Sequence, residues 1–501
     1  MTLNTHETLA AFKAAQKSPI DDPVFAGLLA KSTFAESGSP TSGLTFYDLE
    51  PGAKMLVPVL TPLRNDVPRA TGKGGIQANW KAITGLNTAS VRAGISPGNR
   101  GGVIAVTTQD YNAVYKGIGL EANVDFEAVY AGQGFDDLRA VAAQTLLESL
   151  MLQEEQIILG GNGSLALGTT PTPSLTASSA GGSLATGTLS VIAVALTFDG
   201  YLNSAVAGGI PAAVTRTNAD SSSDTFGGGS ARKSSNATVS VTGPTGSVAA
   251  TVASVRGAVG YAWFWGSSGS ETLGAITTIN SVAIAAAASG TQAASTRPSA
   301  DNSVNALVFD GLLTQCFKSS LNAYYAAQPT GTAGTGTPLT ADSEGGIVEF
   351  DAALKSFWDN YRLSPTAIYV SSQEMLNIHK KILQGGTNTA ARFVFAADQG
   401  AVLGGVMVRS YLNKFSMAGA TEIPIRLHPN MPAGTVLFFT KNLPYPLSNV
   451  PNTVQIRTRR DYYQVEWPLR ARRYEYGVYA DEVLQNYAPF AFGAISNIGN
   501  G

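Results

Sequence analysis

Two neighbouring stretches of this chain read as long β-strands with too few apolar residues to form a core of their own. The first, TGKGGIQANWKAITGLN at residues 71–87, predicts a hairpin made of a strand, turn glycines and a second strand that carries Trp80. The second, GGVIAVTTQDYNAVYKGIGLEANVDF at residues 101–126, predicts one or two further long strands. Because an isolated hairpin is marginal in water, this one requires a partner surface, which another subunit could supply.

The clearest helix follows in the sequence DDLRAVAAQTLLESLMLQEEQIIL, residues 136–159. Asp136 is the expected N-cap, and the glycine pair that begins at Gly160 ends the helix. Roughly 24 residues at 1.5 Å each give a rod of about 36 Å, which is long for a globular domain and suits a structural spine. Glu154 and Glu155 lie on this helix, and we expect them to be surface charges rather than an acid/base pair.

The composition changes at residue 164, and until residue 303 the chain consists mainly of Ser, Thr, Ala and Gly with few charges. Short runs such as LSVIAVALT, ATVSVTG and GYAWFWG alternate with Gly/Ser turns. This spacing predicts a β-sandwich of immunoglobulin-like size. The sandwich is expected to be an insertion, because helical sequence resumes at residues 310–328 and 350–362.

The remaining segments are shorter and differ in character. Residues 1–50 begin with a short amphipathic helix at about Thr5–Gln16 and predict an arm rather than a domain. Residues 363–450 alternate strand and helix; SPTAIYVSSQEMLNIHKKIL predicts a strand, a serine cap and a helix. Residues 453–485 alternate polar and apolar side chains over a length that predicts long antiparallel strands.

Charge is concentrated near the C-terminus, in RTRRDYYQVEWPLRARRYEYGVYADEVLQNYAP at residues 457–489. Nucleic-acid binding, a subunit interface and a solvated strand face are three interpretations of this stretch. Nearby carboxylates nearly balance its arginines, and the whole chain carries a net charge of −2. Since guanidinium groups that pair with carboxylates and stack on aromatic rings suit protein interfaces, we favour the subunit interface over nucleic acid.

Catalytic and metal-binding motifs are missing from the sequence. The chain has one cysteine, Cys316, which we expect to be buried, and three dispersed histidines, His6, His379 and His428. HExxH, CxxC and a Walker A loop do not occur. The sequence also lacks a signal-peptide pattern at its start and a run of about 18 apolar residues. We therefore expect a soluble, unsecreted protein of a reducing compartment with no catalytic, cofactor or metal site.

The order of these elements resembles that of the major capsid proteins of tailed bacteriophages, which have the Hong Kong 97-type fold. RATGKGGIQANWKAITGLN resembles the extended loop, and GFDDLRAVAAQTLLESLMLQEEQIILGGNG resembles the spine helix. SPTAIYVSSQEMLNI resembles the start of the axial domain, and DYYQVEWPLRARRYEYGVYADEVLQNYAPFAF resembles the closing strands of the peripheral domain. The resemblance covers 1–163 and 304–501, and 164–303 departs from the basic pattern of a family that tolerates immunoglobulin-like insertions.

The resemblance implies an α+β fold with five parts. These are an N-terminal arm (1–50), the extended-loop hairpin and peripheral domain with the spine helix (51–163), an inserted all-β immunoglobulin-like sandwich (164–303), the axial domain (304–450), and the closing strands of the peripheral domain with the C-terminus (451–501).

The resemblance also implies a structural protein, not an enzyme, that forms pentamers and hexamers of an icosahedral shell around double-stranded DNA. Its expected partners are copies of itself, portal and scaffold proteins, and packaged DNA contacted non-specifically; a decoration protein stays open, and no membrane is involved. The expected location is the virion capsid, assembled in the host cytoplasm. Two alternatives stay open: the shell of an encapsulin-type nanocompartment, and an extracellular glycan-binding or adhesive β-protein suggested by 164–303.

Within this reading, the candidate inter-subunit residues are Lys73, Trp80, Lys81, Arg457, Arg459, Arg460, Glu466, Trp467, Arg470, Arg472, Arg473 and Glu475. Some relatives form Lys–Asn cross-links from the extended loop. Lys73 and Lys81 are cross-link candidates by position alone, since no sequence pattern identifies the partner asparagine.

Overall fold

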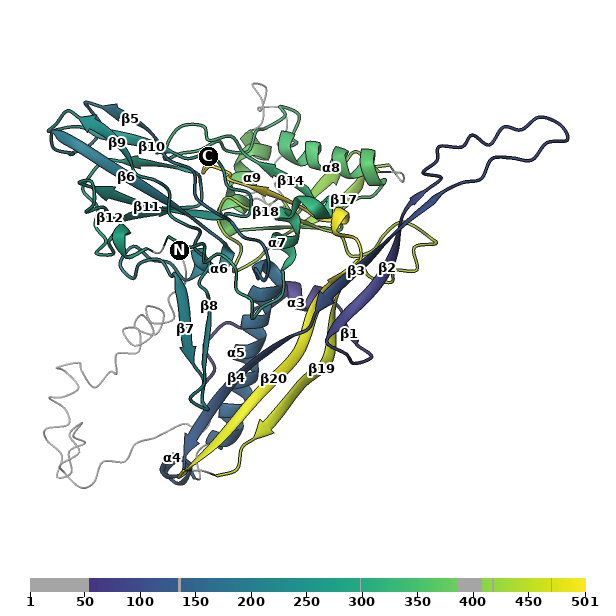
Figure 1. Cartoon of the computed structure of the whole chain (residues 1–501), viewed down its shortest axis with the longest axis horizontal. Coiled ribbons are helices and arrows are strands. Elements are labelled where there is room, and N and C mark those ends of the chain that lie inside the picture. Colours follow the sequence, from purple (N-terminus) through teal and green to yellow (C-terminus); the bar gives the residue numbers. More distant parts are fainter. Residues whose placement is uncertain (1–53, 134–136, 298, 385–407, 417–418, 470) are drawn as a thin grey trace, which may run out of the picture. The chain divides into compact units, whose positions relative to one another are not determined.

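The computed structural model describes residues 54–133, 137–297, 299–384, 408–416, 419–469 and 471–501 (Figure 1). The expected arm at 1–50, Asp136 and Arg470 lie outside these residues. The chain forms two compact units. The described residues of the first unit are 54–59, 122–133, 137–145, 468–469 and 471–475, and the others form the second unit.

Helices and strands are mixed along the chain, which confirms the expected α+β class. The described α-helices are α3 (Pro62–Asp66), α4 (Phe126–Gly132), α5 (Leu138–Gly160), α6 (Phe198–Leu202), α7 (Leu312–Phe317), α8 (Val348–Tyr361) and α9 (Ser372–Gln384).

Helix α5 is the expected spine helix, displaced by one or two residues from the predicted range. Its first turn is capped by Asp137, whose Oδ1 accepts hydrogen bonds from the amides of Arg139 and Ala140 at 3.1 and 3.3 Å. At its other end, Gly160 lies where an added Cβ would be 2.4 Å from the ring of Phe198. Glycine is therefore required at this position for close packing.

A four-stranded sheet has the order β1-β19-β20-β4, with β1 (Arg69–Thr71), β19 (Val454–Glu466), β20 (Arg473–Asn486) and β4 (Lys116–Asp125). Strands β19 and β20 are antiparallel from the pair Val454↔Asn486 to the pair Glu466↔Tyr476. This confirms the prediction of long antiparallel strands near the C-terminus.

Strands β2 (Gln77–Leu86) and β3 (Val106–Val114) form a separate two-stranded hairpin, joined by residues 87–105 (Figure 1). The expected hairpin with its turn at the glycines of 72–75 is wrong in its pairing. Strand β1, which precedes those glycines, pairs in parallel with β19 instead. The physical reason is the length of the strands. Strand β2 forms nine residue pairs with β3, whereas β1 has three residues and could form at most three pairs.

The β-rich segment contains two sheets that share a core. One has the order β13-β10-β5, with β13 (Ser281–Ile284), β10 (Ser247–Thr251) and β5 (Ser174–Ser178). The other has the order β12-β11-β6-β9, with β12 (Thr272–Thr277), β11 (Gly260–Gly266), β6 (Gly187–Leu196) and β9 (Ala237–Val241). Val191, Val248 and Trp263 are buried in the core that both sheets contribute to.

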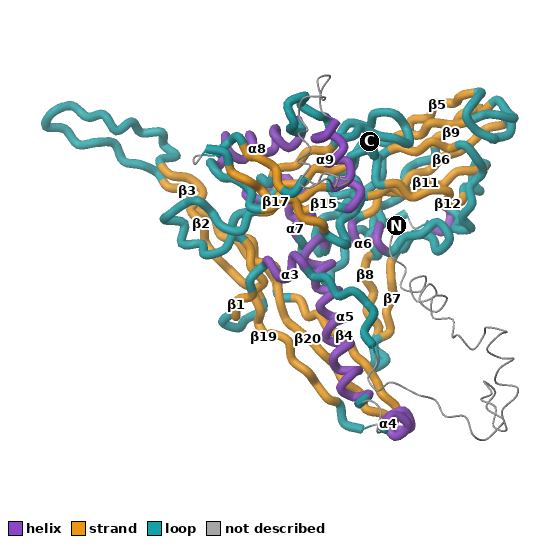
Figure 2. Tube along the Cα trace, turned by 180° about the vertical axis from the view of Figure 1, so that it is seen from behind, coloured by secondary structure: helices purple, strands orange, loops and turns teal. Residues whose placement is uncertain are grey.

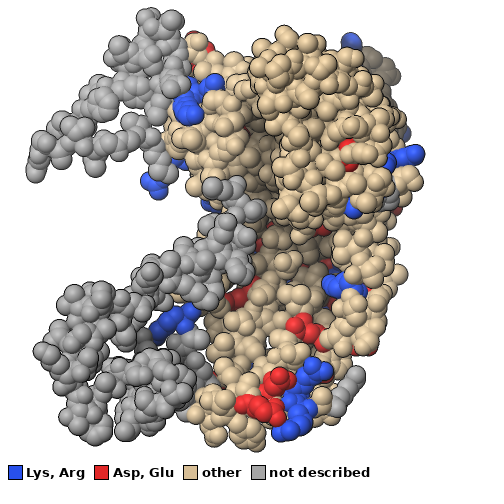
Figure 3. Space-filling view, turned by 90° about the vertical axis from the view of Figure 1, so that its left-hand side faces the viewer, with Lys and Arg blue, Asp and Glu red and all other residues tan. Residues whose placement is uncertain are grey.

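This strand order differs from the constant-type immunoglobulin order, in which the first, second, fourth and fifth strands form one sheet. Two sheets with a shared core agree with the expected sandwich. Its immunoglobulin-like character and its place as an insertion stay predictions. A further hairpin, β7 (Ala213–Thr217) with β8 (Ser223–Gly227), lies outside both sheets. Figure 3 shows the left-hand side of the view in Figure 1, where charged side chains are few on the described surface.

The last sheet has six strands in the order β14-β21-β18-β15-β17-β16. Its members are β14 (Tyr324–Ala327), β21 (Gly493–Ser496), β18 (Val436–Phe439), β15 (Ala367–Val370), β17 (Thr421–Leu427) and β16 (Ser410–Asn413). Helix α8 packs on this sheet (Figure 2). Its Phe350 and Phe357 meet Phe438 of β18 edge to face. These rings belong to the largest buried cluster of the described chain.

Three expectations for this region have different outcomes. The order of strand, serine cap and helix is confirmed, since the hydroxyl of Ser371 accepts the amide of Glu374 between β15 and α9. The helical prediction for 310–328 is right for α7 and wrong for β14, because Asn322 turns the chain with a φ of +55° and β14 then pairs with β21. Strand β21 lies in this sheet rather than with the closing strands.

Candidate functional site

The β2/β3 hairpin leaves most of its side chains in solvent. Ala78 is the only fully buried residue of its two strands, and Val103 in the connecting loop is 89 % exposed. The large apolar side chains exposed along the hairpin and next to it are Ile76, Ile83, Leu86, Ile95, Val103, Ile104, Val106 and Val114. Since eight large apolar side chains exposed on one hairpin and its loop are more than a monomeric protein usually displays, this arrangement indicates an interaction surface.

Trp80 lies near the start of the hairpin and packs within its own chain. Its ring stacks on Tyr111 of β3, with centroids 5.8 Å apart, and meets Tyr487 edge to face at the same distance. The indole borders a groove of about 390 Å³ that Val483 and Pro489 also line. The indole N–H has no hydrogen-bond partner in the described structure. An inter-subunit role for Trp80 stays a prediction.

The two lysines of this region are exposed. Lys73 lies between β1 and β2, and Lys81 is 3.5 Å from Asp110 across the hairpin. Because both members of this ion pair are mostly in solvent, it contributes at most about 1 kcal/mol. The structure brings neither lysine to an identified asparagine, so cross-linking stays a prediction.

The arginines of β19 have partners inside the same chain. Arg459 forms an ion pair with Asp481 of β20 at 2.9 Å. Arg460 stacks over the ring of Tyr463 at 3.7 Å, and Arg457 donates to Gln485 at 3.3 Å. The expected pairing with carboxylates and aromatic rings is therefore present, but within one subunit.

The arginines just before and at the start of β20 are more exposed. Arg472 pairs with Glu127 at 2.7 Å, and Arg473 pairs with Glu475 at 3.0 Å. Glu466 is exposed at the end of β19, and the neighbouring Trp467 is half-buried. The role of these residues between subunits stays a prediction.

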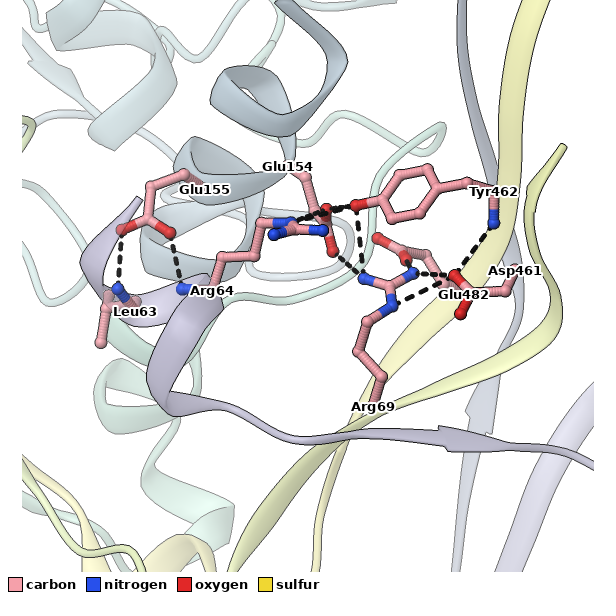
Figure 4. Close-up of polar contacts among 8 residues, drawn as sticks. All are labelled: Leu63, Arg64, Arg69, Glu154, Glu155, Asp461, Tyr462 and Glu482. Carbon is pink, nitrogen blue, oxygen red and sulfur yellow. Dashed lines mark hydrogen bonds and ion pairs between the residues drawn. The ribbon is translucent and has the colours of Figure 1, made fainter. Parts of the chain in front are cut away.

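A buried charge cluster, which the sequence did not reveal, connects five elements (Figure 4). Its centre is Arg69 of β1, whose guanidinium contacts Glu154 of α5 and lies 2.7 Å from both Asp461 and Glu482. Arg64 of α3 donates to Glu154 at 2.8 Å. Tyr462 donates its hydroxyl to Glu154, and its ring lies under the guanidinium of Arg69 at 4.5 Å.

Glu155 forms the second half of this arrangement. Its carboxylate accepts hydrogen bonds from the amides of Leu63 and Arg64 at 2.9 and 2.7 Å. These amides lie in the first turn of α3, where a backbone N–H has no acceptor within the helix. His428 donates Nε2–H to Glu155 at 2.7 Å. The tautomer follows from the other ring nitrogen, Nδ1, which accepts the amide of Asn430 at 3.1 Å.

The expectation that Glu154 and Glu155 are surface charges is therefore wrong, since neither has any exposed area. The physical reason is that arginines, a histidine and backbone amides from other elements compensate both charges, which periodicity along a helix cannot reveal. A sequence signal was nevertheless present: the two glutamates fall between apolar residues that occupy the buried face of α5, such as Leu150 and Ile158.

Burial raises the pKa of Glu482 to about 8; the charge of Glu154 adds to this shift, and Arg69 opposes it. Burial alone would lower the pKa of Arg69, but the charges of Glu482 and Glu154 outweigh it and raise that pKa. Burial also raises the pKa of Glu374, in α9, to about 7. The ion pairs of this cluster hold α3, β1, α5, β19 and β20 together. The cluster can be explained by this structural role without a bound ligand or metal.

Other chemistry is sparse in the described residues. Cys316 is fully buried, as expected, and burial raises the pKa of its thiol. Among the residues that the structure describes, no three His, Cys, Asp or Glu side chains lie close enough to hold a metal ion. A search of the same residues for a helix long and apolar enough to cross a membrane finds none.

No family model matches this chain, and no curated protein matches it. Among solved structures, the chain is similar to the capsid of cyanophage A-1(L), at 10 % identity and a TM-score of 0.43 over 92 % of this chain and 98 % of that one. It is also similar to the capsid of a native GTA particle (8 %, TM-score 0.41, 92 % and 98 %). A third similar structure is the holo-SrpI encapsulin complex of Synechococcus elongatus PCC 7942 (8 %, TM-score 0.38, 89 % and 92 %). At these identities and TM-scores, the likeness does not establish a function.

Proposed function

We propose that this chain is the structural shell protein of a tailed bacteriophage, with the Hong Kong 97-type capsid fold. The observation that carries the proposal is the β2/β3 hairpin, which presents a row of apolar side chains to solvent and has almost no core of its own. In a shell, each hairpin would lie on a neighbouring subunit and bury that row.

The energetics favour such an arrangement. Burying apolar surface contributes about 25 cal/mol per Å², so one large apolar side chain contributes about 1.5–3 kcal/mol. One hairpin contact is therefore modest. A head-to-tail contact that closes into a ring satisfies one such interface for every subunit, and closed symmetry multiplies the gain.

The finer features of the proposal follow the sequence reading. The shell would consist of pentamers and hexamers around double-stranded DNA, assembled in the host cytoplasm with portal and scaffold proteins. Residues 164–303 would be an insertion into the capsid fold, and the tail arginines and Trp80 would contribute to contacts between subunits. A net charge of −2 suits a container that touches DNA without holding it tightly.

The test is electron microscopy and sedimentation of the purified full-length protein, with a scaffold supplied if needed. We expect closed shells tens of nanometres across. Replacing Val103 and Ile104 with Ser should abolish shells without lowering the melting temperature, because both side chains are exposed in the subunit. Val348→Ser, at an exposed apolar position on α8, is the matched control and should assemble normally.

A stable monomer that forms no shells under any of these conditions would overturn the proposal. Normal shells from the Val103/Ile104 variant would refute the role of the hairpin and leave the shell itself standing. Shells that co-purify with a cargo enzyme and without nucleic acid would instead identify a nanocompartment.

A further inference from the structure

Glu482 is a buried carboxyl group with one of its two oxygens unsatisfied. It has no exposed area, and its Oε2 accepts from Arg69 at 2.7 Å. Its Oε1 accepts no hydrogen bond in the described structure. An ionised carboxylate with a bare oxygen is costly in a buried site, and a proton on that oxygen removes most of the cost.

The charges around Glu482 also favour a proton there. Arg69 approaches it from β1, Glu154 from α5, and Asp461 and Tyr462 belong to β19. Arg64 of α3 forms an ion pair with Glu154 and reaches Glu482 only through that residue. With every group ionised, three carboxylates would face two guanidinium groups, and of the three only Asp461 is exposed to solvent.

We propose that Glu482 keeps its proton in the folded chain and that this protonated cluster clamps β1 and α5 to β20, so that opening the clamp releases the proton. Rising pH therefore weakens the clamp. The inference concerns the fold of one subunit and does not depend on the proposed shell. Only the idea that the clamp helps to hold the hairpin for contact with a neighbouring subunit rests on that proposal.

The clamp lies at the entry to the hairpin. Strand β1 has three residues, begins at Arg69, and is held in its sheet by pairing with β19 alone. The chain then passes Gly72 and enters β2 at Gln77. Because a strand of three residues forms few backbone hydrogen bonds, its pairing with β19 is weak by itself. The contacts of Arg69 therefore decide how firmly the base of the hairpin is held to this sheet.

The direction of the pH effect follows from the pKa of Glu482, which the folded state raises from its ordinary value of 4.5 to about 8. Between these two values the closed clamp binds a proton that the open form lacks. The stability of the clamp is therefore fully present below the ordinary value and is lost as the pH rises through the folded value. The opening equilibrium constant should rise about tenfold per pH unit from pH 5 to pH 7 and level off near pH 8.

The experiment is amide hydrogen exchange of the unassembled full-length protein from pH 5 to pH 8.5, followed for residues 69–71 and corrected for the intrinsic exchange rate. The wild type should show the rise described above. Glu482→Gln imitates the protonated carboxyl group and should show opening that does not vary with pH. Glu374→Gln removes another buried carboxyl group of raised pKa, on α9, and should keep the wild-type dependence.

A flat profile in the wild type, or the same rise in Glu482→Gln, would overturn the proposal. If Glu482→Gln does not fold, carboxyl ¹³C NMR of the Glu374→Gln protein replaces it. One glutamate that titrates near pH 8 supports the clamp, and titration of every glutamate below pH 6 refutes it. These measurements use single subunits, so a failure to form shells would count against the proposed function and leave the clamp untouched.

Discussion

Removing the carboxylate of Glu155 tests whether the end of α5 fastens α3 in place. Three donors converge on this carboxylate without access to solvent: the amides of Leu63 and Arg64, and Nε2–H of His428. Helix α3 has only five residues and cannot be stable alone. Its position therefore depends on this cap and on the burial of Leu63.

The expected size of the effect follows from these contacts. A buried donor left unsatisfied costs about 1–3 kcal/mol, so three of them give a range of about 3–9 kcal/mol. Water entering the space left by the side chain will satisfy part of this demand, and removing one partner of a buried charged network costs about 3–5 kcal/mol. We expect Glu155→Ala to destabilise α3 by about 4 kcal/mol, which is roughly a thousandfold in its opening equilibrium. Glu155→Gln keeps one acceptor oxygen and should cost about half as much.

The assay must report on α3 itself, because a chain with two compact units and several cores does not unfold in one step. Native-state hydrogen exchange of the Asn65 and Val67 amides, which donate to the backbone carbonyls of Thr61 and Leu63, gives this local free energy directly. Asp110→Ala is the control: it removes an exposed carboxylate from the pair with Lys81 and should change exchange in α3 by less than about 0.5 kcal/mol. Exchange in Glu155→Ala within about 1 kcal/mol of the wild type would refute the reasoning.

Two further changes test the packing elsewhere. Trp263→Ala empties the core between the two sheets of the β-rich segment, where the indole is fully buried and donates to Thr277 at 2.9 Å; it should cost about 3–5 kcal/mol, measured by hydrogen exchange of β6 and β11. Equal protection in wild type and variant would contradict this. Gly119→Ala places a Cβ 2.1 Å from the ring of Tyr479, so the ring must move and lose its bond to Glu121; native-state hydrogen exchange of β4 should show a loss of about 1–3 kcal/mol. Gly94→Ala, where the new methyl meets nothing within 4 Å, is the control, and equal exchange in β4 for both variants would show that the ring yields freely.

Elements whose identity depends on local periodicity could be predicted from the sequence. The spine helix was expected at 136–159 and runs over Leu138–Gly160, because a long apolar stripe and a glycine stop leave few alternatives. The strand, serine cap and helix around Ser371 followed for the same reason, since the cap is encoded within four residues.

Features that depend on contacts distant in sequence were not predictable. Strand β14 was expected to be helical, because its two tyrosines favour a strand but its two alanines do not, and pairing with β21 decides the outcome. The true partner of β2 was missed because turn glycines at 72–75 are as compatible with a change of sheet as with a hairpin. The burial of Glu154 required arginines about 85–90 residues away in the chain, and no single-sequence pattern connects them.

The concentration of charge at residues 457–489 now has an explanation within one subunit. Arg459 pairs with Asp481 across β19 and β20, and Asp461 and Glu482 both reach Arg69 of β1. These contacts tie together long strands that cannot all bury apolar side chains, and they account for part of the charge in this stretch. A role of the remaining arginines between subunits stays a prediction. The apolar row on the β2/β3 hairpin has no comparable explanation among the described residues. A test of assembly therefore discriminates better when it changes the hairpin than when it changes the arginines, because removing an arginine also weakens the subunit that carries it.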